Sequence, residues 1–73
     1  MQARDRKAGI YMVGMYEVEC VFDDGYSELR KVCVDGKTER TRLHHIQEMI
    51  KAWWPITAPC EVNIKLFRLI ECE

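Results

Sequence analysis

Two adjacent histidines are the residues of this chain best suited to acid–base or metal chemistry. His44 and His45 follow one another, and Glu48 stands about one helical turn after His44. An imidazole and a carboxylate at this spacing supply two ligands, too few for a tight zinc site. Neighbouring helical residues point about 100° apart, and both histidines are expected on the solvent side of a helix. A small metal-dependent or nuclease-type enzyme is therefore the least favoured interpretation, and we assign no catalytic residue, metal or cofactor.

Basic side chains gather at the predicted start of that helix. Lys37, Arg40 and Arg42, with His44 beside them, form a local cluster. A helix N-terminus adds free N–H groups and a partial positive charge, so this cluster suits phosphate contact. The whole chain, however, carries 11 Lys+Arg against 12 Asp+Glu, and it has no interleaved exposed aromatic residues on which bases would stack. Contact with nucleic acid is an alternative that we rank below protein binding.

The cysteines and the apolar runs bear on the compartment. Cys20, Cys33, Cys60 and Cys72 include no Cys-x-x-Cys pair, so they are expected to be free thiols rather than metal ligands. No apolar run approaches the ~18 residues of a membrane-spanning helix. The short run over residues 10–15 follows basic residues but lacks a small-residue cleavage site, which argues against a signal peptide. A cytoplasmic protein without membrane contact is expected.

Apolar residues alternate with polar ones over residues 10–22, a period of two that predicts a strand with one wet face. Asp23-Asp24-Gly25 marks a hairpin, and a second strand follows over residues 26–34. A three-residue loop gives paired residues whose numbers sum to 48, which keeps the apolar face intact; a two-residue loop scrambles that face. The three-residue loop is therefore predicted, with Gly25 in a left-handed conformation.

A helix and a third strand complete the pattern. Thr38 is a suitable N-cap, and apolar residues recur at three- and four-residue spacing from Leu43 to Trp53. Trp54-Pro55 ends the helix, because the residue before a proline is disfavoured in helical backbone. Alternation resumes over residues 60–72 and breaks at residues 67–70, which predicts a bulge or burial on both sides there.

The order strand, strand, helix, strand predicts a single small α+β domain over residues 10–73, preceded by a flexible arm over residues 1–9. A right-handed crossover makes the third strand parallel to the second. If it lies beyond the first strand, the sheet has the order 2-1-3 and every neighbouring pair is antiparallel. One helix then covers one face of the sheet.

The other face and two sheet edges stay uncovered in this fold, and a chain of 73 residues is marginal as a monomer. Trp54, which follows Trp53 at the end of the predicted helix, is a further candidate anchor for a partner. We expect a small non-enzymatic interaction or regulatory module, a homodimer or a binder of another protein, that acts through the uncovered face or an edge strand. The apolar residues expected on the uncovered face are Tyr11, Val13, Met15, Leu29, Cys33, Phe67 and Leu69, and the last five of these are the predicted interface residues.

Overall fold

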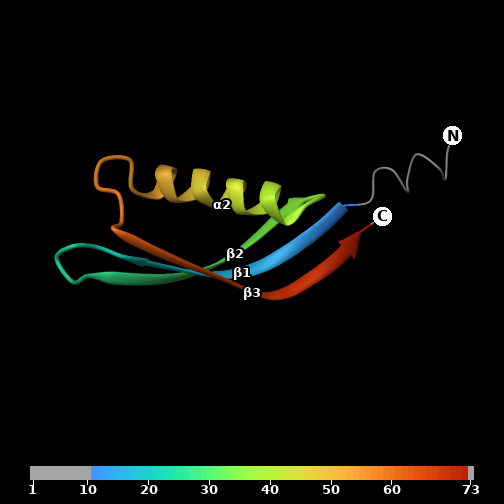
Figure 1. Cartoon of the computed structure of the whole chain (residues 1–73), viewed down its shortest axis with the longest axis horizontal. Coiled ribbons are helices and arrows are strands. Elements are labelled where there is room, and N and C mark those ends of the chain that lie inside the picture. The colour runs from blue at the N-terminus through green and yellow to red at the C-terminus, as the bar shows by residue number, and fades with distance from the viewer. Residues whose placement is uncertain (1–10, 73) are drawn as a thin grey trace, which may run out of the picture.

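A helix lies on one side of a three-stranded sheet in the computed structural model, which describes residues 11–72 (Figure 1). The elements are β1 (Tyr11–Val21), β2 (Ser27–Gly36), α2 (Glu39–Trp53) and β3 (Glu61–Cys72). The sheet order is β2-β1-β3, and both neighbouring pairs are antiparallel. The predicted fold class and topology are confirmed. The predicted arm over residues 1–9 lies outside the described residues. Within the described residues, no helix is long and apolar enough to cross a membrane.

The hairpin between β1 and β2 has the predicted three-residue loop. Residues such as Val21 and Ser27 pair so that their numbers sum to 48. The Phe22 N–H donates to the Tyr26 carbonyl at 2.8 Å, which closes the ladder across the loop. Gly25 has a φ of 93°, a conformation that side-chain-bearing residues rarely adopt.

The helix begins and ends where the sequence predicts. Thr38 has extended backbone angles, and its side-chain oxygen accepts a hydrogen bond from the Thr41 N–H at 3.2 Å. At the other end, the Trp54 N–H donates to the Ile50 carbonyl at 3.0 Å. Pro55 follows at once and has no N–H to continue the pattern.

The core lies between α2 and the side of the sheet that faces it. Even-numbered residues of β1 supply most of it, as the period of two requires. The helix contributes two isoleucines one turn apart. The buried apolar residues are Tyr16, Val18, Cys20, Phe22, Val34, Ile46 and Ile50.

A bulge interrupts β3. Tyr16 pairs with Leu66, but the preceding residue of β1, Met15, pairs with Arg68. Phe67 is therefore an extra residue without a partner on β1, and an insertion of this kind bends the strand locally. The predicted irregularity is confirmed as a bulge.

The bulge exchanges the two faces for the residues that follow it. Leu69 now stands opposite Gly14, which is on the side of β1 that faces α2. Ile70 stands opposite Val13, on the uncovered side. The expectation that Leu69 lies on the uncovered face is wrong, because strict alternation along β3 ignores the inserted Phe67.

Candidate functional site

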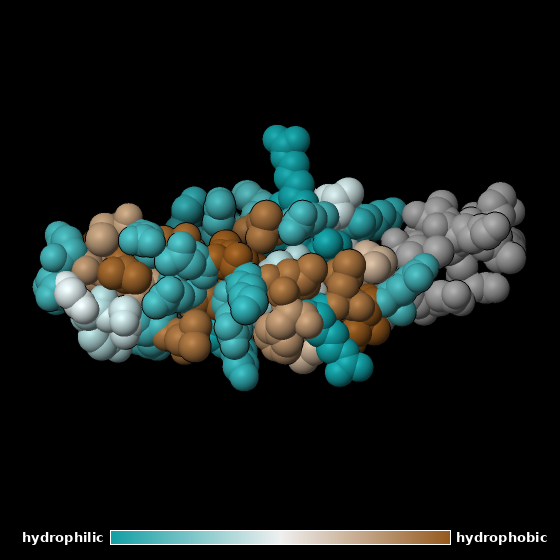
Figure 2. Space-filling model, turned by 60° about the horizontal axis from the view of Figure 1, so that its bottom comes forward, coloured by the Kyte–Doolittle hydropathy of each residue, from teal (hydrophilic) through white to brown (hydrophobic). Residues whose placement is uncertain are grey.

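The face of the sheet turned away from α2, called here the open face, carries four of the predicted interface residues. Met15 and Cys33 are directly paired on it. Phe67 is 47% exposed, and the Lys31 ammonium lies 5.8 Å from the centre of its ring. Figure 2 shows apolar side chains on this side of the molecule, separated by hydrophilic ones.

Charged residues divide the open face. Glu17 lies between Lys31 and Lys65 in the register of the three strands. Leu29 is 58% exposed and stands opposite Glu19, on the far side of this charged row. The apolar residues of the open face therefore do not form one continuous patch.

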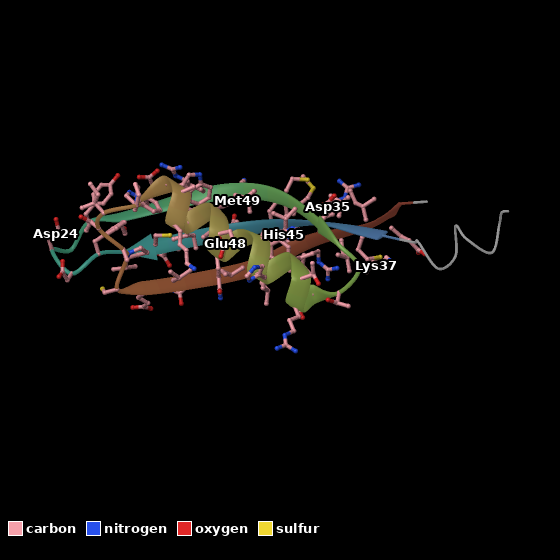
Figure 3. The ribbon with its side chains drawn as sticks, turned by 90° about the horizontal axis from the view of Figure 1, so that it is seen from above. Asp24, Asp35, Lys37, His45, Glu48 and Met49 are labelled. Carbon is pink, nitrogen blue, oxygen red and sulfur yellow. The ribbon has the colours of Figure 1, made fainter. Side chains whose placement is uncertain are left out.

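A second apolar surface lies on the helix side of β3. Viewed from above, α2 crosses the sheet obliquely (Figure 3). It packs mainly against β2 and β1, so much of β3 remains uncovered. Val62 and Leu66 are each 38% exposed, and Leu69 is 43% exposed. With the partly buried Ile64, these residues form what we call the β3 row.

A groove of about 330 Å³ separates the helix from the first half of the β3 row. Its floor is the strand, and its wall is the C-terminal half of α2. The connector between α2 and β3 closes one end. The lining residues are Gln47, Ile50, Lys51, Ala58, Pro59, Val62 and Ile64.

A second groove, of about 450 Å³, separates α2 from β2. Here a polar contact spans the two elements, because His45 Nδ1 lies 4.0 Å from Asp35 Oδ1. Met49 also lines the groove on the helix side (Figure 3). In the part of the chain that the structure describes, a polar side-chain contact therefore joins α2 to β2, and none joins α2 to β3.

The two histidines are exposed, as predicted, and among the described residues neither forms an ion pair with Glu48. His45 faces Asp35, while Glu48 accepts a hydrogen bond from the Lys51 ammonium at 3.3 Å. The rings of His44 and His45 are 6.5 Å apart between centroids and diverge. Within residues 11–72, no three His, Cys, Asp or Glu side chains form a group that would hold a metal ion.

Arg42 does not belong to the exposed basic cluster. Only 4% of it is exposed. Its Nε donates to the Tyr16 hydroxyl at 3.0 Å, and its Nη1 donates to the Gly36 carbonyl at 3.0 Å. The prediction that Arg42 contacts nucleic acid is therefore corrected: its N–H groups bind the chain's own sheet. Lys37 and Arg40 remain exposed at the helix start.

Trp54 is half-buried and packs within the chain. Its ring meets Phe22 edge-on at 5.0 Å between centroids. The Arg30 guanidinium lies 4.5 Å from the centre of the Trp53 ring and 4.9 Å from that of Trp54, within range of cation–π attraction. The tryptophan pair thus closes the hairpin end of the core. Less of the Trp54 surface is therefore available to a partner than if the side chain were fully exposed.

A hydrogen-bonded pair continues this cluster toward solvent. The Tyr26 hydroxyl donates to Glu28 at 2.8 Å, and Arg30 pairs with the same carboxylate. The hydrogen bond from Tyr26, followed by that from Arg30, lowers the pKa of Glu28 below its ordinary value. The same bond raises the pKa of Tyr26.

The structure describes the side chains of three of the four cysteines, and all three are free thiols. Cys20 is buried under the helix, and this burial raises the pKa of its thiol. Cys33 and Cys60 are exposed. The side chain of Cys72 lies outside the described residues.

The exposure of the β3 row does not follow from the sequence pattern. Val62, Ile64 and Leu66 alternate regularly, and this pattern predicts the helix-facing side of a strand and hence coverage by the helix. The available sign was the helix length: about 22 Å for the 15 residues of α2, against roughly 40 Å for the 12 residues of β3. Because α2 is short and crosses obliquely, it leaves one edge strand bare.

Comparison of the chain with protein-family models, with curated proteins and with solved structures finds no match.

Proposed function

We propose that this chain is a small non-enzymatic interaction module that associates with a second copy of itself. The observation that carries the proposal is the β3 row, in which Val62, Leu66 and Leu69 stay 38–43% exposed beside an apolar groove. Full burial of such side chains contributes about 1.5–3 kcal/mol each. The part still exposed leaves roughly 0.6–1.3 kcal/mol per side chain for a partner to gain.

Two further features support protein binding over contact with nucleic acid. The net charge is −1, so no general positive field attracts a polyanion. Arg42 is buried and bound internally, which reduces the helix-start cluster to Lys37, Arg40 and the exposed His44. The exposed thiols of Cys33 and Cys60 suit a reducing compartment, and we propose the cytoplasm.

The experiment is the molar mass of the full chain in solution as a function of concentration, measured by light scattering behind size exclusion and by sedimentation equilibrium. We expect the mass of two chains at high concentration and reversible dissociation on dilution. A single-chain mass at every concentration would overturn the proposal. The same runs at raised salt separate an apolar association from a purely ionic one, because salt screens exposed charges.

A further inference from the structure

The two edges of the sheet are protected differently. On β2, two of the residues facing the helix side are charged, Glu28 and Arg30, and α2 reaches this edge through the contact of His45 with Asp35. Charges that point inward, and elements that cover an edge, hinder pairing with another chain. The helix-facing side of β3 from Val62 to Leu69 carries only apolar residues. Pairing is therefore favoured at β3.

The bulge limits how much of β3 is available for pairing. An extra residue at Phe67 disrupts the regular ladder and bends the strand. The regular part of β3 that precedes it runs over residues 61–66. A second chain therefore has one short, straight segment on which to add a strand.

Symmetry restricts the register of two such segments. A two-fold axis perpendicular to the sheet pairs antiparallel strands and keeps each side chain on its own face, provided that one residue sits on the axis. An axis at Lys65 places two lysines opposite each other. An axis at Ile64 pairs Asn63 with Lys65 and gives Glu61 no cation.

An axis at Asn63 places compatible side chains opposite each other on both faces of the sheet. Glu61 then lies opposite Lys65 of the second copy, twice by symmetry, on the open face. On the helix side, Val62 lies opposite Ile64 of the second copy, also twice. Over the straight segment, this register pairs each charged residue with an opposite charge and each apolar residue with an apolar one.

Building on the proposed self-association, we propose that two copies pair antiparallel through residues 61–65, centred on Asn63. The product is a continuous six-stranded sheet with both helices on one face. The groove beside each β3 row then borders the junction, and Val62 and Ile64 of each copy cover the apolar floor of the other. The occupant of this edge is a second copy of the chain.

Cysteine cross-linking tests the register directly. In a background with Cys33, Cys60 and Cys72 changed to serine, residues on the axis lie about 4.5–5.5 Å apart between Cα atoms, within disulfide range. We expect Asn63→Cys to give a disulfide-linked dimer under mild oxidation. The matched control is Lys65→Cys, whose two copies are offset by four residues, or about 13 Å, and form no disulfide.

A pair of lysine substitutions separates the edge from the open face. We expect Val62→Lys to weaken dimerisation at least tenfold, because the new ammonium lies in the apolar junction. Leu29→Lys, on the open face of β2, is expected to leave the dimer unchanged. Far-UV circular dichroism reports whether each variant folds; if Val62→Lys does not, the cross-linking result decides.

The outcomes distinguish this inference from the function on which it rests. A dimeric wild-type chain in which Asn63→Cys does not cross-link, or in which Leu29→Lys rather than Val62→Lys dissociates the dimer, overturns the β3 pairing and leaves self-association standing. A wild-type chain that is monomeric at all concentrations overturns both. Cross-linking of Lys65→Cys alone also overturns the register, because it places the axis at Lys65.

Discussion

The buried contact between Arg42 and Tyr16 gives the most specific stability prediction. The arginine is 4% exposed, and its Nε donates to the Tyr16 hydroxyl at 3.0 Å. Tyr16→Phe removes the hydroxyl without altering the ring, so the buried N–H loses its acceptor. A hydrogen bond to a charged group contributes about 1.5–3 kcal/mol, and the larger part of that loss is expected where water cannot replace the acceptor.

For a chain of this size, each 1 kcal/mol lowers the unfolding midpoint by roughly 4–8 °C. We therefore expect Tyr16→Phe to lower it by about 6–24 °C. The matched control is Tyr26→Phe, since that hydroxyl also makes one side-chain hydrogen bond but belongs to an exposed residue. The control is expected to leave the midpoint nearly unchanged, because water replaces a partner lost at the surface.

A double-mutant cycle identifies the cause of the loss. Arg42→Met removes the charge and keeps much of the apolar stem, and in the double variant with Tyr16→Phe no N–H is left unsatisfied. The assay is urea unfolding followed by tryptophan fluorescence, at one fixed protein concentration because association adds to apparent stability. Strict additivity of the two single changes, or a Tyr16→Phe loss no larger than that of the control, would refute the reasoning.

Two further predictions concern Gly14 on β1 and Glu28 on β2. A Cβ at Gly14 would lie 2.5 Å from Cε1 of Tyr16, so Gly14→Ala should displace that ring and cost about 1–3 kcal/mol in urea unfolding; unchanged stability would contradict the close packing of the ring over the glycine. The pKa of Glu28 is lowered by its bonds to Tyr26 and Arg30. Its contribution to stability is therefore present above the ordinary carboxyl pKa and is lost as the pH falls through the lowered one. Glu28→Gln should remove this loss of stability at acid pH, which is measured by urea unfolding followed by tryptophan fluorescence at each pH. An identical loss in wild type and variant would contradict the prediction.

Local rules account for most of the architecture. The hairpin register followed from face matching alone, because a two-residue loop sets Val18 against Lys31. Thr38 and Pro55 marked the helix ends through hydrogen-bonding chemistry that needs no tertiary contact. These features are fixed by neighbours in the sequence, and the sequence is sufficient for them.

The features that were missed depend on where one element crosses another. Arg42 is four residues before Ile46 and so shares the buried stripe of α2, but only the position of Tyr16 beneath it supplies an acceptor. The exposure of Val62 and Leu66 depends on the crossing direction of the helix. The exact inserted residue, Phe67, depends on pairing between residues of β1 and β3 that are at least fifty positions apart at the bulge.

The bulge links these observations to the candidate interface. A long, regular and exposed edge strand is an open template for repeated strand addition. The insertion at Phe67 confines the straight edge to residues 61–66, while Lys65 and Arg68 place charges on its open face. An edge that is short and bounded at one end favours a closed pair over an extended assembly, because a two-fold junction uses each β3 edge once. The more strongly protected β2 edge then terminates the six-stranded sheet on both sides.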